Sequence, residues 1–203
     1  MAETESSGGG SCGIVLLASG SGTLAQSVLD AAAAGDCPYR VIALVSDRAC
    51  EAVARADRAG IPTAVLRPGD HPDRAAWDLA LAETVARFAP DWVVSAGFMR
   101  ILGPAVLAGA PVINTHPALL PSFPGAHGVR DTLAHGVRVT GTTCHLVDDG
   151  VDTGPIIDQR ACRVEPEDTE DTLHERIKVL ERRMLVDVLA GLAAGTIALP
   201  ARG

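Results

Sequence analysis

The chain has 203 residues, of which 47% are hydrophobic and 21% charged, as in a folded globular protein and unlike a disordered one. Its formal net charge of −8 argues against a protein whose main activity is holding nucleic acid through phosphate contacts. The sequence contains no apolar run of the roughly 18–20 residues that span a membrane, and the opening MAETESSGGGS lacks the basic and apolar regions of a signal peptide. We therefore expect no membrane partner, a cytoplasmic location, a disordered tail at 1–12 and a single domain at 13–203.

Short apolar strands alternate with helices through the first half of the chain. Strands are predicted at 13–18, 40–46, 63–67, 92–97 and 111–114. Helices are predicted at 24–35, 49–59 and 72–88. On the third helix, four apolar side chains recur at helical spacing and form one face: Trp77, Leu81, Val85 and Phe88. This alternation is typical of a parallel sheet with helices on both faces, which binds ligands at the carboxyl ends of its strands.

After residue 135 the pattern changes to longer β-rich segments. These segments, 137–147 and 155–164, flank the turn DDGVDTG, and we expect added antiparallel strands there. A long final helix is predicted from Thr169 to about Ala193, with acidic residues at its start that complement the helix dipole. Its predicted buried stripe consists of Leu173, Ile177, Leu180, Met184 and Val188. The predicted fold class is α/β, with a mostly parallel sheet.

A glycine-rich turn, ASGSGT at 18–23, joins the first strand to the first helix. Gly20 and Gly22 let the backbone approach a ligand closely, and amides at a helix N-terminus attract anions such as phosphate. The turn is not a Walker motif, and Ala25 stands where the third glycine of a dinucleotide fingerprint belongs. A single phosphate is therefore favoured over a dinucleotide, and a tight turn without a ligand stays open as the alternative.

Two polar side chains end the strand at 111–114 and begin the motif NTHP. Asn114 and His116 are two positions apart, so in extended chain they point to the same side. A histidine can move a proton near neutral pH, and an asparagine amide can donate to a developing oxyanion. A histidine that bonds only to backbone is the structural alternative, but the pairing with Asn114 at the carboxyl end of a strand favours a catalytic site.

Two further segments could complete such a site. In DDGVDTGP, Asp148 and Asp149 are typical solvated turn residues, whereas glycines flank Asp152. If Asp152 faces His116, it would favour the charged imidazolium. In AGFMRIL at 96–102, the apolar residues are either core or the wall of a site for a flat heteroaromatic ligand. The five cysteines and the remaining histidines have no metal-ligand spacing, so we expect reduced thiols and no metal.

The segments LLASGSGT, AGFMRILGP, NTHPALLPSFPGAHG and VDDGVDTGPII, in this order and at these separations, resemble the phosphoribosylglycinamide formyltransferases of the folate-dependent formyltransferase family. The resemblance covers roughly residues 13–190. It implies a Rossmann-like half at 13–114 that binds the nucleotide phosphate, followed by a folate-binding and catalytic half at 115–203. The implied reaction transfers a formyl group from the co-substrate 10-formyltetrahydrofolate to the amine of glycinamide ribonucleotide in purine biosynthesis.

Three groups of site residues follow from the resemblance. The catalytic residues are Asn114, His116 and Asp152. The ribonucleotide site comprises Gly20, Ser21, Gly22, Thr23, Leu24 and Glu181. The folate site comprises Arg74, Met99, Arg100, Ile101, Leu102, Asn114, Asp148, Asp149, Gly150, Val151 and Asp152. At Leu24 the family pattern usually has asparagine, so a side-chain hydrogen bond to the phosphate is lost there.

Four alternative functions fit the sequence less well. A methionyl-tRNA formyltransferase would need a further C-terminal tRNA-binding domain, and a formyltetrahydrofolate deformylase an N-terminal regulatory domain. A dinucleotide-dependent oxidoreductase is weakened by the incomplete glycine fingerprint, and a nucleotide-binding module without activity leaves the Asn114 and His116 pair unexplained. We therefore expect small-molecule partners and no nucleic acid, while the oligomeric state is left open.

Overall fold

The computed structural model describes residues 11–35 and 37–200. In this part of the chain, seven strands form one sheet in the order β3–β2–β1–β4–β5–β6–β7. The strands are β1 (Cys12–Ala18), β2 (Tyr39–Ser46), β3 (Thr63–Val65), β4 (Trp92–Ser95), β5 (Val112–His116), β6 (Val139–Leu146) and β7 (Ile156–Arg163). The first five pair in parallel, and β6 and β7 extend the sheet as antiparallel strands.

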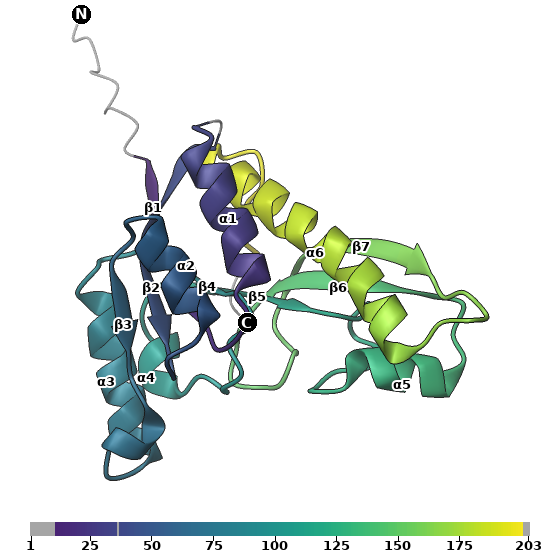
Figure 1. Ribbon diagram of the computed structural model, residues 1–203, viewed down its shortest axis with the longest axis horizontal. Helices are drawn as coiled ribbons and strands as arrows, with labels where there is room; N and C mark the ends of the chain where they lie inside the picture. The colour runs from purple at the N-terminus through teal and green to yellow at the C-terminus, as the bar shows by residue number, and fades with distance from the viewer. Residues whose placement is uncertain (1–10, 36, 201–203) are drawn as a thin grey trace, which may run out of the picture.

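Helices cover both faces of this sheet (Figure 1). They are α1 (Thr23–Ala33), α2 (Glu51–Arg58), α3 (Arg74–Ala86), α4 (Pro104–Leu107), α5 (Gly128–His135) and α6 (Glu170–Ala193), with a short 3-10 turn, η1 (Pro68–Asp70). Helices α1, α2 and α6 pack on one face, and α3 and α4 pack on the other. The predicted α/β fold with a long C-terminal helix is confirmed.

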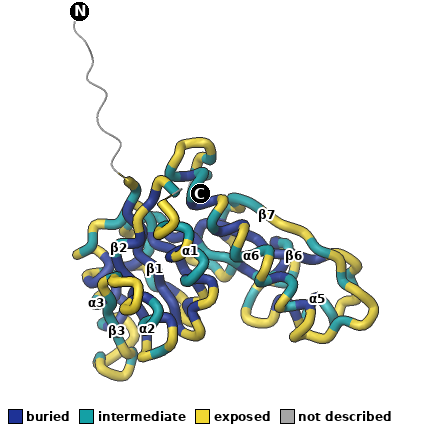
Figure 2. Tube along the Cα trace, turned by 45° about the horizontal axis from the view of Figure 1, so that its top comes forward, coloured by how far each residue is buried: buried dark blue, intermediate teal, exposed yellow. Residues whose placement is uncertain are grey.

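Strand β1 shows why the centre of the sheet is the core of the molecule. Ile14 and Leu16 face the layer of α1 and α6, while Val15 and Leu17 face the layer that contains Trp77. Successive strand residues point to opposite faces, so a strand that is apolar at every position is buried on both sides. The buried central strands in Figure 2 follow from this composition.

Two short helices, α4 and α5, were not predicted from the sequence. Helix α5 lies in the segment after the prolines, where Val129 packs against Leu173 and Ile177 of α6. Such short helices are marginal alone and depend on tertiary packing, which local sequence does not reveal. The predicted stripe of α6 also needs a correction, because Leu180 is only half-buried and the buried face continues through Leu185, Leu189 and Leu192.

Two of the predicted boundaries are the end of the N-terminal tail and the change to antiparallel strands. Cys12 is already part of β1, Ser11 is exposed, and residues 1–10 of the predicted tail lie outside the described residues. All four pairs among β1–β5 are parallel and the two later pairs antiparallel, so the change of pattern falls after β5 as predicted.

A buried carboxylate ties α3 to the segment after β4. Asp78 accepts hydrogen bonds from the backbone N–H groups of Gly103 at 2.8 Å and Ala105 at 2.9 Å. A Cβ atom at Gly103 would lie 2.4 Å from this carboxyl group, so only glycine fits there. Asp78 thereby fixes the start of α4 and the end of segment 97–102, which lines the site described below.

We predict that Asp78→Ala lowers the free energy of unfolding by about 1–3 kcal/mol, because two buried N–H groups lose their acceptor. Urea denaturation should show this as a lower midpoint with an unchanged slope. Glu83→Ala, at an exposed position of the same helix, is the matched control and should change stability by less than about 0.5 kcal/mol. Equal effects of the two substitutions on stability would contradict the role of Asp78 as the acceptor for these two N–H groups.

Candidate active site

Two adjoining cavities lie where β1, β4 and β5 end. The smaller measures about 250 Å³ and the larger about 500 Å³. Both are lined by Phe98, Met99, Ile101, Asn114, Ala126, Val151 and Asp152. His116 lines only the larger cavity and His145 only the smaller one. Two ligands, one bound in each cavity, would therefore meet beside Asn114 and Asp152.

His116 sits at the tip of β5 with both ring nitrogens facing acceptors. Nε2 donates to the Phe123 carbonyl oxygen at 2.7 Å, and Nδ1 lies 3.2 Å from Oδ2 of Asp152. A carbonyl oxygen and an ionised carboxylate both accept, so the doubly protonated imidazolium fits this setting best. Only 5% of the His116 side chain is exposed, which makes the nearby carboxylate important for holding a positive charge.

Asp152 is held by three neighbours. Its Oδ2 accepts from the backbone N–H of Gly125 at 2.8 Å, and its Oδ1 lies 3.5 Å from Nε2 of His145. Burial alone would raise the pKa of Asp152, but the contact with His145, the Gly125 N–H and the charge of His116 outweigh it and lower the pKa. The carboxylate is therefore ionised in the folded protein at neutral pH.

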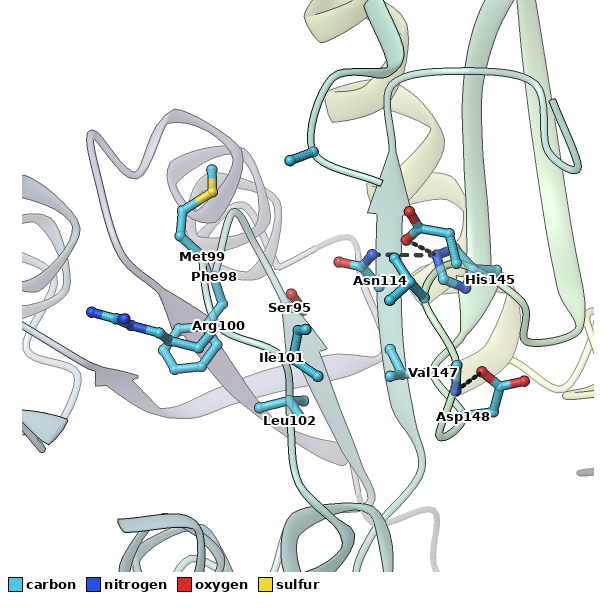
Figure 3. Close-up of a pocket in the computed structure, with 14 residues that line it drawn as sticks. Ser95, Phe98, Met99, Arg100, Ile101, Leu102, Asn114, His145, Val147 and Asp148 are labelled. Atoms are coloured by element: carbon cyan, nitrogen blue, oxygen red, sulfur yellow. Dashed lines mark hydrogen bonds and ion pairs between the residues drawn. The ribbon is translucent and has the colours of Figure 1, made fainter. Parts of the chain in front are cut away.

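Asn114 is oriented by His145, its register partner on the neighbouring strand β6. Nδ1 of His145 donates to the Leu146 carbonyl oxygen at 2.8 Å, which leaves Nε2 facing the Asn114 amide nitrogen at 3.2 Å (Figure 3). Nε2 accepts from this amide when the ring is neutral, and donates to Asp152 when the ring is protonated. His145 thus connects the two polar groups that both cavities share.

The turn that carries Asp152 is closely packed. Asp148 accepts from the Thr153 hydroxyl at 2.7 Å and from the Gly150 N–H at 3.1 Å. A Cβ atom at Gly150 would lie 2.0 Å from the Thr153 hydroxyl oxygen, and one at Gly154 would lie 1.9 Å from the Leu146 carbonyl oxygen. Asp152 itself has a φ of 55°, in the left-handed region that aspartate tolerates better than most residues. Packing therefore fixes the direction of its carboxylate.

The glycine-rich turn after β1 presents unpaired amides to the larger cavity. Among the described residues, none of the backbone N–H groups from Gly20 to Leu24 donates to an acceptor. Gly22 has a φ of 71°, and α1 begins at the next residue. The side chain of Leu24 is buried in the core, so this position offers only its backbone amide. The turn is suited to an anion that several N–H groups can bind at once.

Helix α6 supplies ionisable side chains on the other wall of the larger cavity, namely His174, Lys178 and Glu181. Lys178 Nζ lies 2.7 Å from Glu175 and keeps further donors for a ligand. Burial raises the pKa of Glu181, although the Thr115 hydroxyl donates to it at 2.7 Å. Burial lowers the pKa of His174, and the charge of Lys178 adds to that effect.

Segment 97–102 forms the apolar wall of the smaller cavity. Met99 is 74% exposed and Ile101 67% exposed, which is unusual for such side chains and leaves their surface free for a ligand. The segment is anchored where the Met99 N–H donates to the Ser19 hydroxyl at 2.9 Å and Arg100 Nε donates to Asp47 at 2.7 Å. In Figure 3 the Arg100 guanidinium extends away from Asn114.

The structure brings most of the predicted site residues together. All the predicted ribonucleotide residues line the larger cavity: Gly20, Ser21, Gly22, Thr23, Leu24 and Glu181. The smaller cavity is lined by Met99, Arg100, Ile101, Leu102, Asn114, Asp148, Gly150, Val151 and Asp152. Arg74 and Asp149 are not among its lining residues. Arg74 lies behind the wall, where it donates to the Ile101 carbonyl and stacks 4.8 Å from the Trp77 ring.

Sequence reasoning did not assign three side chains that line the cavities. His145 and His174 were set aside for lack of metal-ligand spacing, and Lys178 was not singled out, although His174, Lys178 and Glu181 follow helical spacing on one face of α6. Residues from 13–114 and from 115–203 line both cavities, so each cavity is formed by both of the predicted halves.

The described residues contain no group of three or more His, Cys, Asp or Glu side chains that could hold a metal ion. No helix among them is long and apolar enough to cross a membrane.

Comparison with known proteins identifies the family. Residues 13–189 match the family model for formyl transferase. The chain belongs to the formyl transferase family. The phosphoribosylglycinamide formyltransferase of Mycobacterium tuberculosis (strain ATCC 25618 / H37Rv) is 57% identical over 182 residues, which cover 89% of this chain and 84% of that protein. The resemblance noted in the sequence is confirmed, and the chain groups with the phosphoribosylglycinamide formyltransferases.

Solved structures of formyl transferases share the fold. The crystal structure of glycinamide ribonucleotide transformylase 1 from Symbiobacterium toebii superposes with a TM-score of 0.90 at 41% identity, covering 94% of this chain and 92% of that one. The corresponding enzyme from Geobacillus kaustophilus has a TM-score of 0.86 at 38% identity, covering 91% of this chain and 100% of that one. The Rossmann-like formyl transferase fold is thereby established for this chain.

We predict that Asp152 stabilises the formyl transferase fold in a pH-dependent way. Its folded pKa is lowered below the unfolded value of about 3.9. The stabilisation is therefore fully present above about pH 3.9 and is lost as the pH falls through the lower folded value. The difference in unfolding free energy between the wild type and Asp152→Asn, from urea denaturation, should shrink between pH 5.5 and pH 3. Asp149→Asn, at an exposed position in the same turn, is the control.

Proposed function

We propose that this enzyme transfers a formyl group from 10-formyltetrahydrofolate to the amine of glycinamide ribonucleotide, a step of purine biosynthesis. The observation that carries the proposal is the pair of adjoining cavities, one with an apolar wall and one with unpaired amides, which share Asn114 and Asp152. A reaction between two separately bound small molecules needs such a junction, because holding both partners in place replaces a random collision.

The formyl-folate is assigned to the smaller cavity. Its flat heteroaromatic ring system would pack against the exposed side chains of Met99 and Ile101 and against Leu102. Polar groups at the opposite wall, in turn 148–152, supply hydrogen bonds that fix the ring's orientation. The formyl group would then lie beside Asn114, at the opening into the larger cavity.

The ribonucleotide is assigned to the larger cavity. Its single phosphate would accept from the amides of Gly20–Leu24 at the start of α1, with the charge of Lys178 nearby. The buried Glu181, held by Thr115, is placed to orient polar groups of the nucleotide. With the phosphate held at one end, the amine at the other end of the molecule would point towards Asn114 and His116.

The side chains at the junction account for the steps of the reaction. The amine nitrogen bonds to the formyl carbon, the carbonyl oxygen becomes an oxyanion, and the bond from carbon to N10 of the folate then breaks. The Asn114 amide donates to the oxyanion, and the His116 imidazolium stabilises the same charge. One proton leaves the attacking amine and another reaches N10, and His116 with Asp152 provides the route for this transfer.

Rival functions fit the site less well. In a dinucleotide-dependent oxidoreductase, an acid after the second strand receives the ribose hydroxyls. Here that acid, Asp47, is 2% exposed and pairs with Arg48 and Arg100. Burial would raise the pKa of Asp47, but these two arginines lower it well below its usual value, so its oxygens are already engaged. The net charge of −8 disfavours tRNA as the acceptor.

The remaining expectations stay part of the proposal. We place the enzyme in the cytoplasm, supported by five widely spaced cysteines that are all free thiols. The partners are the two small-molecule substrates, and no metal takes part in the proposed steps.

A difference-absorbance assay tests the function directly. The protein is mixed with 10-formyltetrahydrofolate and glycinamide ribonucleotide, and the release of tetrahydrofolate is followed together with the formylated product. Glycinamide without the ribose phosphate should be a very poor acceptor. Release of tetrahydrofolate without a formylated nucleotide, formylation of tRNA instead, or binding of a nicotinamide cofactor would each refute the proposal.

We predict that His116→Ala lowers kcat by about 10²–10⁴, the usual contribution of a positioned acid or base. The folate Kd should change little, because His116 lines only the larger cavity. His71→Ala, directly after η1 and outside both cavities, is the control and should keep nearly normal turnover. Near-normal kcat in the His116 variant would exclude it from the chemistry.

We predict that Lys178→Ala raises the KM for the ribonucleotide by about tenfold, the value of one charge-assisted hydrogen bond of about 1.4 kcal/mol. Arg183→Ala, on the same helix but outside the larger cavity, should leave this KM within about twofold. A substitution at Gly22 is a poor test, because its Cβ would lie 2.6 Å from the Ala52 backbone and would disturb folding. Equal KM values for the two variants would remove Lys178 from the phosphate site.

A further inference from the structure

Arg55 on α2 lies outside both cavities, yet its side chain reaches the glycine-rich turn. Its Nε donates to the Ser21 carbonyl oxygen at 2.9 Å, and one terminal nitrogen donates to the Gln26 side chain on α1 at 3.2 Å. The backbone N–H of Ala52, on the same helix, donates to the Gly20 carbonyl oxygen at 3.1 Å. Two consecutive carbonyl groups of the turn are thus bound by α2.

The planarity of the peptide group converts these two contacts into a direction for the amides. In a trans peptide the C=O and N–H groups point to opposite sides. Because α2 holds the carbonyls of Gly20 and Ser21, the N–H groups of Ser21 and Gly22 point away from α2. Both residues line the larger cavity, and neither N–H donates to another described residue.

Packing alone restricts the two glycines of the turn to different degrees. Gly22 lies directly against α2, where a Cβ atom would approach the Ala52 Cα to 2.6 Å. At Gly20, a Cβ atom would meet no other atom within 4 Å, so side-chain packing does not restrict the turn at that position. The peptide between Ser21 and Gly22 thus lies between a tightly packed glycine and a glycine with open space, and the hydrogen bond from Arg55 to its carbonyl oxygen fixes its orientation.

We propose that Arg55 is a positioning residue for the phosphate of the acceptor substrate. It holds the peptide between Ser21 and Gly22 so that the Gly22 amide faces the phosphate, and its bond to Gln26 ties the same peptide to α1. This inference rests on the proposed function in that the phosphate belongs to the ribonucleotide. Arg55 itself contacts neither cavity, so it acts through the turn and not on the substrate.

The matched control is Arg58, one turn further along α2. It donates to Glu51 at 2.7 Å, its side chain is 62% exposed, and among the described residues it makes no hydrogen bond to the turn. Arg55 also lies 4.0 Å from Glu51, so both arginines share this surface ion pair. Their comparison therefore separates the contact with the turn from loss of a positive charge on the helix.

Steady-state kinetics on the full chain form the first test. Arg55→Ala should raise the KM for glycinamide ribonucleotide by about tenfold, and kcat and the KM for formyl-folate should stay within about twofold. Arg58→Ala should match the wild type. Arg55→Lys, which can still donate to the Ser21 carbonyl, should recover part of the loss. The Arg55→Ala effect should persist at 0.5 M salt, where a purely long-range charge effect would be screened.

A second test needs no formyl transfer. The Ser21 and Gly22 amide signals in the NMR spectrum of ¹⁵N-labelled protein should shift on titration with ribose 5-phosphate in the wild type and in Arg58→Ala. In Arg55→Ala these shifts should be smaller and the Kd higher by about tenfold. Unchanged titration and KM in folded Arg55→Ala would overturn the inference and leave the proposed function standing. Normal phosphate titration without ribonucleotide formylation in the wild type would overturn the proposed function instead.

Discussion

The contact between His116 and Asp152 is the constraint on which the rest of the site depends. A positive imidazolium that is nearly buried is costly unless a carboxylate lies beside it, and the two residues come from segments far apart in the chain. Their meeting requires that β5 end at His116 and that the turn after β6 stop at a fixed place. The surrounding structure keeps the end of β5 and the turn after β6 at a fixed distance from each other.

Strand pairing and hydrogen bonds from Thr143 hold these two segments in place. Antiparallel pairing with β6 places Asn114 opposite His145, and the hydroxyl of Thr143 binds both the carbonyl of Ala118 and the N–H of Leu120. The proline-containing loop after β5 is therefore fixed to the neighbouring strand, and the Phe123 carbonyl is available to His116. The chain tolerates a left-handed backbone at Asp152 because its tightly packed neighbours leave no other path.

Residues behind the cavities hold the two substrate walls. Asp47 anchors segment 97–102 at Arg100, Asp78 on α3 anchors Gly103 directly after that segment, and α2 anchors the glycine-rich turn. Each anchor is a hydrogen bond to backbone or to a charged group, so each fixes direction as well as position. The groups that face the ligands are mostly backbone amides and exposed apolar side chains. Their orientation depends on the residues behind them. Substitutions behind the walls should therefore alter binding without touching a substrate.

The sequence by itself determined the layers of the fold through local patterns, and most of the candidate site residues through the resemblance to a known family. Alternating apolar runs set the parallel sheet, glycines marked the turn after β1, and the spacing of Asn114 and His116 placed them on one side of a strand. Tertiary structure alone decided which distant groups meet: His145 beside Asn114, Lys178 across from the turn, and Arg55 behind it. It also decided that Arg74 supports the wall from outside and that α5 forms. These depend on register and packing between segments distant in sequence, which no local pattern records.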